Sequence, residues 1–124
     1  MPQRAAASPN LRMRRVYDEP SPDDGRRVLV DRLWPRGLAK EQAKVDDWPK
    51  DLTPSSELRR WYHEAPDERH AEFVTRYEAE LAAPAAQQAL HGLRAAVRQG
   101  PVTLLTAVKE IPHSHVEVLA RHLR

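Results

Sequence analysis

Two short, mainly apolar runs interrupt a chain in which apolar and charged positions are otherwise mixed. The first is Val-Leu-Val at positions 28–30, and the second is Val-Thr-Leu-Leu-Thr-Ala-Val at positions 102–108, which contains threonines but no charged residue. A run of this kind is typical of a strand that is covered on both faces. The pattern therefore predicts buried central strands over about residues 27–33 and 102–108.

A third strand is predicted near the N-terminus, where apolar and charged residues alternate. Leu11, Met13 and Val16 are separated by arginines, which indicates an edge strand over about residues 11–18. The segment Pro-Ser-Pro-Asp-Asp-Gly that follows has the composition of a turn and is too short for a helical crossover. We therefore expect this edge strand and the strand at 27–33 to form an antiparallel hairpin.

Four to five helices are expected around these strands. Residues 38–52 suggest one or two helical turns followed by an irregular loop. Thr53 is expected to cap a helix with Pro54 at its first position, Pro66 begins another helix, and Gly100 ends a third. Together these elements predict an α/β fold with a small sheet.

The last helix has the clearest start. Ser114 and Glu117 stand three residues apart, in the pattern of a capping box, where each side chain accepts from the other residue's backbone N–H. A helix start also presents free N–H groups and the positive end of the helix dipole. The sequence therefore places an element suited to anion binding directly after the second buried strand.

The composition fits one globular domain. The chain has 124 residues, of which 40% are hydrophobic and 31% are charged, and it contains no cysteine. Disulfides, thiolate catalysis and cysteine-based metal sites are thereby excluded. We expect residues 1–11 to form a flexible arm and residues 12–124 to form a single α/β domain.

Charge and hydropathy narrow the range of partners. The pI is near 9.2, yet residues 1–15 hold four arginines and no acid, which leaves 16 basic and 18 acidic residues, a net charge of −2, for the rest of the chain. Because the basic excess belongs to the arm, a nucleic-acid partner is less favoured. No apolar run approaches the roughly 18 residues of a transmembrane helix, and no secretory signal is recognisable, so we expect a cytoplasmic protein without membrane contact.

Both buried strands are followed by clusters of polar residues. In parallel α/β sheets, ligands bind beyond the carboxyl ends of the strands. If the two strands are parallel neighbours, both clusters meet beside the capped helix start and form a site for a small anionic ligand. The first cluster holds Asp31, Arg32 and Arg36, and the second holds Lys109, Glu110, His113, Ser114 and His115.

The residue types suggest roles within such a site. Carboxylates and a neutral imidazole suit acid–base chemistry, so the catalytic candidates are Asp31, Glu110 and His113. The ligand-binding candidates are Arg32, Arg36, Lys109, Ser114 and His115. The structural alternatives are a strand-end ion pair between Asp31 and Arg32, a simple turn at Arg36, and solvated histidines beside a helix cap.

Neither a metal nor a cofactor is indicated. The side chains of His113 and His115 are two residues apart at a helix start, where imidazoles diverge, so we expect no metal site. The four glycines, at positions 25, 37, 92 and 100, exclude a Walker loop and a dinucleotide-binding fingerprint. The identity of any cofactor is left unknown.

The two polar segments also carry a family resemblance. The stretch RVYDEPSPDDGRRVLVDRLWPRG, followed by GPVTLLTAVKE and a histidine, resembles the YeaO-like proteins of the DUF488 family. The resemblance covers residues 14 to about 122. It implies a compact bacterial α/β protein, without an established reaction, substrate or cofactor.

The second motif departs from the pattern of these relatives, which typically read Tyr-Ala-Ala-Lys-Asp-x-x-His-Asn-x-Ala. In this chain the tyrosine is replaced by Thr106 and the second alanine by Val108. The aspartate is replaced by Glu110, and the first asparagine by Ser114. Ser114 keeps the capping function, because serine and asparagine cap about equally well. The tyrosine hydroxyl is lost at Thr106, so a ligand contact that relatives share there is not expected.

Three functions follow from these observations, in order of preference. The first is a protein that binds a small anionic molecule at the strand ends, with or without transforming it, so that the question of enzymatic activity is left open. The second is a nucleic-acid-associated or regulatory module that uses Arg12, Arg14 and Arg15. The third is a partner-binding structural protein without catalysis. The oligomeric state is not predicted.

Overall fold

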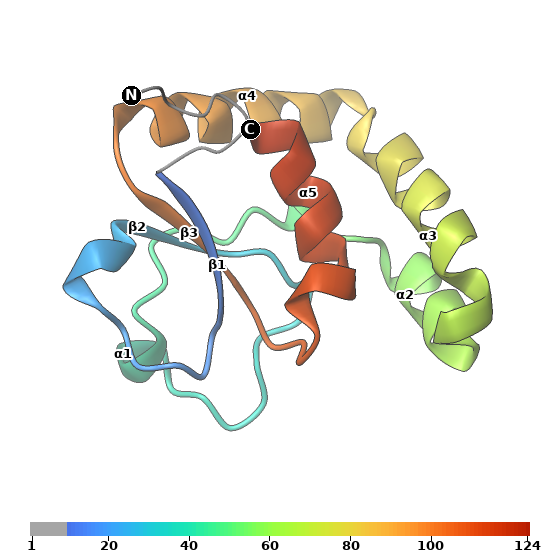
Figure 1. Cartoon of the computed structure of the whole chain (residues 1–124), viewed down its shortest axis with the longest axis horizontal. Coiled ribbons are helices and arrows are strands. Elements are labelled where there is room, and N and C mark those ends of the chain that lie inside the picture. Colours follow the sequence, from blue (N-terminus) through green and yellow to red (C-terminus); the bar gives the residue numbers. More distant parts are fainter. Residues whose placement is uncertain (1–9) are drawn as a thin grey trace, which may run out of the picture.

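The computed structural model describes residues 10–124, which form a three-stranded sheet surrounded by helices (Figure 1). Residues 1–9, most of the predicted arm, lie outside this range. The strands are β1 (Leu11–Arg15), β2 (Arg26–Leu29) and β3 (Val102–Thr106). The helices are α1 (Lys40–Ala43), α2 (Ser56–Glu64), α3 (Pro66–Leu81), α4 (Pro84–Gln99) and α5 (His115–Leu123), with short 3-10 helices η1 (Pro22–Asp24), η2 (Lys50–Leu52) and η3 (Ile111–His113). The predicted α/β class is confirmed.

The strand order is β1-β3-β2, and both β1 and β2 pair with β3 in parallel. The predicted antiparallel hairpin is therefore wrong, because β1 and β2 are not neighbours. The ten residues of the link at 16–25 contain a turn and the 3-10 helix η1, and a chain of this length can span at most about 33 Å when fully extended. That reach is enough to return along a five-residue strand and to cross two strand spacings, so no helix is needed for this crossover.

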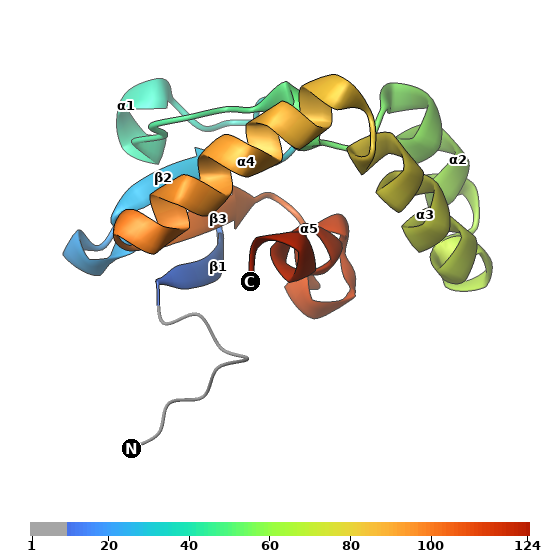
Figure 2. The same cartoon turned by 90° about the horizontal axis from the view of Figure 1, so that it is seen from above.

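The sheet is covered on both faces, as the apolar runs predict. Val28 and Leu104 belong to the larger core, which includes α2 to α5. Leu29 and Leu105 point to the opposite face and pack with Val16 and with Ala43 of α1. Figure 2 shows the sheet between α1 and α5. Every residue of β3 is buried, in keeping with its central position.

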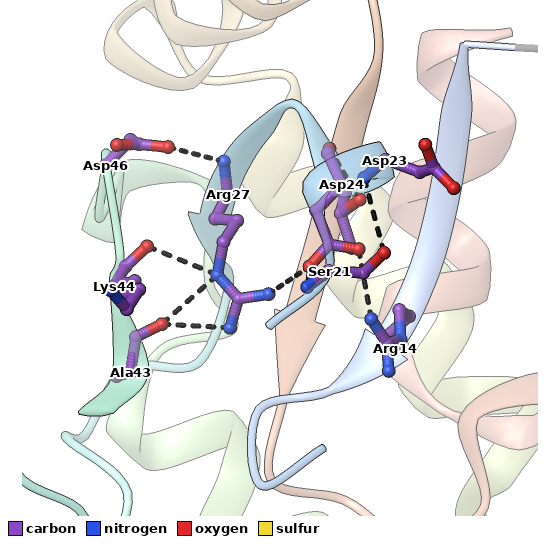
Figure 3. Close-up of polar contacts among 9 residues, drawn as sticks. Arg14, Ser21, Asp23, Asp24, Arg27, Ala43, Lys44 and Asp46 are labelled. Atoms are coloured by element: carbon purple, nitrogen blue, oxygen red, sulfur yellow. Dashed lines mark hydrogen bonds and ion pairs between the residues drawn. The ribbon is translucent and has the colours of Figure 1, made fainter. Parts of the chain in front are cut away.

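A buried ion-pair network joins the N-terminal end of β2 to its neighbours (Figure 3). Asp24, only 1% exposed, accepts from Arg27 at 2.5 Å and from Arg14 of β1 at 3.0 Å. The guanidinium of Arg27 also donates to the carbonyls of Ala43 and Lys44 at the end of α1. Burial raises the pKa of Asp24, but the Ser21 N–H and the two arginines outweigh it and lower the pKa.

The start of α2 also differs from the sequence-based prediction. Thr53 ends η2 and donates to the carbonyl of Lys50, so Ser55 is the N-cap and accepts from the N–H of Leu58. The Ser55 backbone N–H and hydroxyl both donate to the carboxylate of Glu80 on α3. This tertiary contact favours Ser55, and local sequence does not reveal it.

Candidate functional site

The carboxyl ends of β2 and β3 open into a pocket of about 590 Å³. Its walls come from residues 31–36 after β2, residues 107–115 after β3, and side chains of α2 and α3. Because β2 and β3 are parallel neighbours, the two polar clusters meet at one edge of the sheet. The predicted residues that line the pocket are Asp31, Arg32, Arg36, Glu110, His113, Ser114 and His115; Lys109 is exposed and is not part of the lining.

Asp31 lies at the centre of this meeting point. Its carboxylate accepts from the Thr106 hydroxyl and the Ala107 N–H, each at 2.7 Å, and lies 3.2 Å from the His115 ring. Burial raises the pKa of Asp31, but the hydrogen bond and charge of His115, together with the other two donors, outweigh burial and lower it. Asp31 therefore stays ionised and joins the ends of both core strands to α5.

His115 is held in one tautomer by two acceptors. Its Nε2 lies 2.9 Å from the carbonyl oxygen of Val30 and 3.2 Å from Asp31. A carbonyl can only accept, so Nε2 must carry a proton. Nδ1 has no hydrogen-bond partner within residues 10–124. Every buried side-chain polar atom of these residues does have such a partner, so Nδ1 is not buried. Nδ1 is therefore accessible to solvent, and His115 is one of the residues that line the pocket.

Arg32 lines the pocket but is committed to the fold. Its guanidinium donates to the carbonyls of Pro54 at 3.0 Å, Thr53 at 3.3 Å and Lys50 at 3.4 Å. These carbonyls lie at the end of η2 and just before α2. Arg32 thus fixes the loop that leads into α2, and its donors are largely occupied.

Two other arginines are free to meet a ligand. Arg36 is exposed in the turn after β2, and Arg59 on α2 is half-buried. Within the described part of the chain, neither guanidinium makes a hydrogen bond or an ion pair, and both line the pocket. Sequence reasoning missed Arg59, because nothing local distinguishes it from Arg60. Only the packing of α2 turns Arg59 toward the strand ends.

Histidines surround the pocket on its helical side. His113 of η3 stacks on His70 of α3, with ring centroids 3.9 Å apart and an interplanar angle of 11°. His70 also lies 3.2 Å from the Tyr62 hydroxyl. Burial, followed by the charges of His113 and Arg121, lowers the pKa of His70. The neutral form of the His70 imidazole is therefore favoured.

A second histidine on the helical side behaves in the same way. Burial, followed by the charges of Arg59 and His115, lowers the pKa of His63, which lines the pocket. In the part of the chain that the structure describes, no three His, Cys, Asp or Glu side chains form a group that could hold a metal ion.

The capping of α5 is simpler than predicted. The Ser114 hydroxyl accepts from the Val116 N–H at 3.1 Å and donates to the carbonyl of Ile111. The reciprocal half of the predicted capping box is absent, because the carboxylate of Glu117 lies 3.6 Å from Arg124 at the far end of the helix. The long side chain of Arg124, about two turns along the chain, offers Glu117 a charged partner in place of a backbone N–H.

Two half-buried tryptophans hold the loop after β2 in place. The indole N–H of Trp34 donates to Leu38 at 2.7 Å, and that of Trp48 donates to the carbonyl of Asp31 at 2.6 Å. The two rings pack edge to face with centroids 5.4 Å apart. On the other side, Arg15 of β1 donates to the carbonyls of Ala107 and Val108. The pocket walls are thus tied to the sheet and are not free loops.

Comparison with known proteins shows which family this chain belongs to. Residues 10–124 match the family model described as "Inactive DUF488-N3 subclade". The chain is 48% identical over 113 residues to the uncharacterized protein Rv3073c of Mycobacterium tuberculosis, covering 91% of this chain and 92% of that protein. It is 44% identical over 118 residues to the uncharacterized protein YeaO of Escherichia coli, covering 93% and 97%. No solved structure matches significantly. The chain is therefore a YeaO-like member of the DUF488 family.

Proposed function

We propose that the protein binds a small organic anion in the pocket at the carboxyl ends of β2 and β3. One observation carries this proposal: Arg36 and Arg59 both line the pocket, and neither guanidinium group has a protein partner among residues 10–124. A guanidinium that is held near a concave surface is well suited to bind a carboxylate or phosphate through two parallel hydrogen bonds.

The size and chemistry of the pocket support a small molecule. A volume of about 590 Å³ lies within the range of roughly 300–1,000 Å³ that is typical of ligand pockets. His115 adds Nδ1, a ring nitrogen without a partner among residues 10–124, as a further polar contact for the ligand. Because Asp67 and Glu110 also line the pocket, the anion is selected by direct contact with the arginines and not by a long-range positive field.

A binding role is favoured over catalysis. The matching family model is described as inactive, and the catalytic candidate Asp31 uses both carboxylate oxygens to hold Thr106, Ala107 and His115. We therefore assign Asp31 to positioning the site. Glu110 and His113, the other two catalytic candidates, are exposed residues that line the pocket, and we propose them here as ligand contacts.

The nucleic-acid alternative has less support. It requires Arg12, Arg14 and Arg15 to face a phosphate backbone. Arg14 is paired with Asp24 at 3.0 Å, and the Arg15 guanidinium donates to two backbone carbonyls. Of the three, Arg12 alone makes no such contact in the described residues and is exposed.

The proposal is tested by thermal unfolding with inorganic phosphate as the probe. We expect about 10 mM phosphate to raise the melting temperature of the wild-type protein, because a ligand that binds only the folded state stabilises it. Arg59→Gln should abolish the increase. Arg60→Gln is the matched control, since Arg60 is its exposed neighbour on α2 and does not line the pocket. An equal increase in all three proteins would refute the assignment of the site.

A further inference from the structure

Two large hydrophobic side chains are exposed in the described part of the chain, and both lie at the same pocket. Leu33 is 60% exposed and Tyr17 is 43% exposed. Both line the pocket that holds Arg36 and Arg59. Single exposed apolar residues need no explanation, but the fact that both of those found among residues 10–124 lie at one concave site does need one. We call Leu33 and Tyr17 the mouth patch.

The fold holds the mouth patch in its exposed position. The Tyr17 hydroxyl donates to the carbonyl of Arg36 at 3.0 Å, and the Arg15 guanidinium lies 5.2 Å from the centroid of the Tyr17 ring. Leu33 sits between two anchored residues, Arg32 and Trp34, whose side chains donate to backbone carbonyls of neighbouring loops. Neither Leu33 nor Tyr17 can withdraw into the core without breaking these contacts.

The interior of the pocket continues the same apolar character. Phe73 is buried and stacks on Tyr62, with centroids 4.3 Å apart, and both line the pocket together with Pro35 and Pro54. Arg36 connects the two kinds of chemistry, because its carbonyl accepts from the Tyr17 hydroxyl while its guanidinium makes no hydrogen bond or ion pair within residues 10–124. An arginine whose cation is unpaired among these residues is therefore joined through its backbone to the mouth patch.

We propose that the ligand is an organic anion with an aromatic or similarly flat apolar body, in which the anionic group contacts Arg36 and Arg59 and the ring covers the mouth patch. This inference rests on the proposed function and specifies its ligand class. A small molecule is favoured over a protein partner, because two side chains around a bounded pocket are far less than the roughly 1,000 Å² that a specific protein interface requires.

Isothermal titration calorimetry with charge-matched ligands tests the inference. Phenyl phosphate and methyl phosphate carry the same anionic group and differ in the ring. We expect phenyl phosphate to bind the wild-type protein at least about tenfold more tightly. Benzoate and acetate, compared in the same way, establish whether the site takes phosphate or carboxylate. The advantage of the ring should appear with whichever anion binds.

Variants of the mouth patch show where the ring binds. Leu33→Ser should remove most of the advantage of phenyl phosphate and leave the affinity for methyl phosphate unchanged. Leu33→Met, which keeps an apolar side chain, should retain the advantage. Equal affinity of the two phosphates would overturn the inference while leaving the proposed function intact. An advantage that persists in Leu33→Ser would also overturn it. The inference would be overturned as well if sedimentation showed that the wild-type protein self-associates and that Leu33→Ser abolishes this association. If none of the four anions binds, the proposed function fails and the inference fails with it.

Discussion

Replacement of Asp31 by asparagine should lower the free energy of unfolding by about 2 kcal/mol at pH 7. Asp31 is the residue through which the ends of β2 and β3 and the start of α5 are joined. Its carboxylate accepts from Thr106, Ala107 and His115 at 2.7, 2.7 and 3.2 Å. Asparagine has nearly the same shape, so the substitution isolates the loss of charge from the loss of volume.

The expected loss of about 2 kcal/mol is the sum of the changes at the three hydrogen-bond partners of Asp31. The asparagine oxygen can keep the Ala107 N–H, and the Thr106 hydroxyl can rotate to accept from the amide NH₂. The His115 Nε2–H then faces another donor, so that contact is lost, at a cost of about 1 kcal/mol. The two remaining bonds lose their charge-assisted character, which adds about 0.5 kcal/mol each.

Urea denaturation followed by tryptophan fluorescence measures this difference. Asp18→Asn, at an exposed position whose side chain makes no hydrogen bond in the described residues, is the matched control and should change stability by less than about 0.5 kcal/mol. The pKa of Asp31 is lowered in the folded protein. Its contribution is therefore present above about pH 3.8 and is lost as the pH falls from there through the folded-state pKa. A cost below about 0.5 kcal/mol at pH 7, or one that grows on acidification, would refute the reasoning.

Three further predictions concern stability. Asp24→Asn should cost about 3 kcal/mol in urea denaturation, because it leaves a buried arginine without its anion; a cost under about 1 kcal/mol would contradict the importance of the network. Gly25→Ala should lower the melting temperature, since φ is +63° and the added Cβ would lie 2.2 Å from a backbone oxygen. Gly92→Ala in α4, where space is open, should instead raise it slightly, and equal effects of the two would argue against the clash. The pKa of His70 is lowered in the folded protein, so the unfolded chain takes up more protons and stability should fall as the pH drops through about 6.5. His70→Gln should flatten this slope in thermal melts between pH 8 and 5; an unchanged slope would exclude His70 as its source.

The sequence by itself determined the parts of the fold that depend on local chemistry. The apolar runs at 28–30 and 102–108 identified strands that are buried on both faces, and prolines and Gly100 located the ends of the long helices. It also identified the two polar clusters that line the pocket, because polar residues directly after buried strands necessarily gather at the edge of a parallel sheet.

Local rules failed where distant partners decided the outcome. The link at 16–25 looked like a hairpin turn, yet β3 lies between the two strands that it connects. Thr53 and Glu117 matched capping patterns, but Glu80 favours Ser55 as the cap and Arg124 attracts Glu117 away from its own helix start. In each case a contact with a residue that is distant in sequence, or a full helix away, outweighs a local preference of about 1 kcal/mol.

Only the tertiary structure decided which charges at the strand ends are available to a ligand. Arg32 and Asp31 belong to the motif that the sequence identifies, but neither is available to a ligand. The guanidinium of Arg32 donates to backbone carbonyls. The carboxylate of Asp31 is held by Thr106, Ala107 and His115. Arg59 carried no local signal and yet lines the pocket without a partner among residues 10–124. A sequence specifies which charges a chain carries, whereas pairing depends on the distances and directions that packing imposes, and unpaired charge is what a ligand can bind.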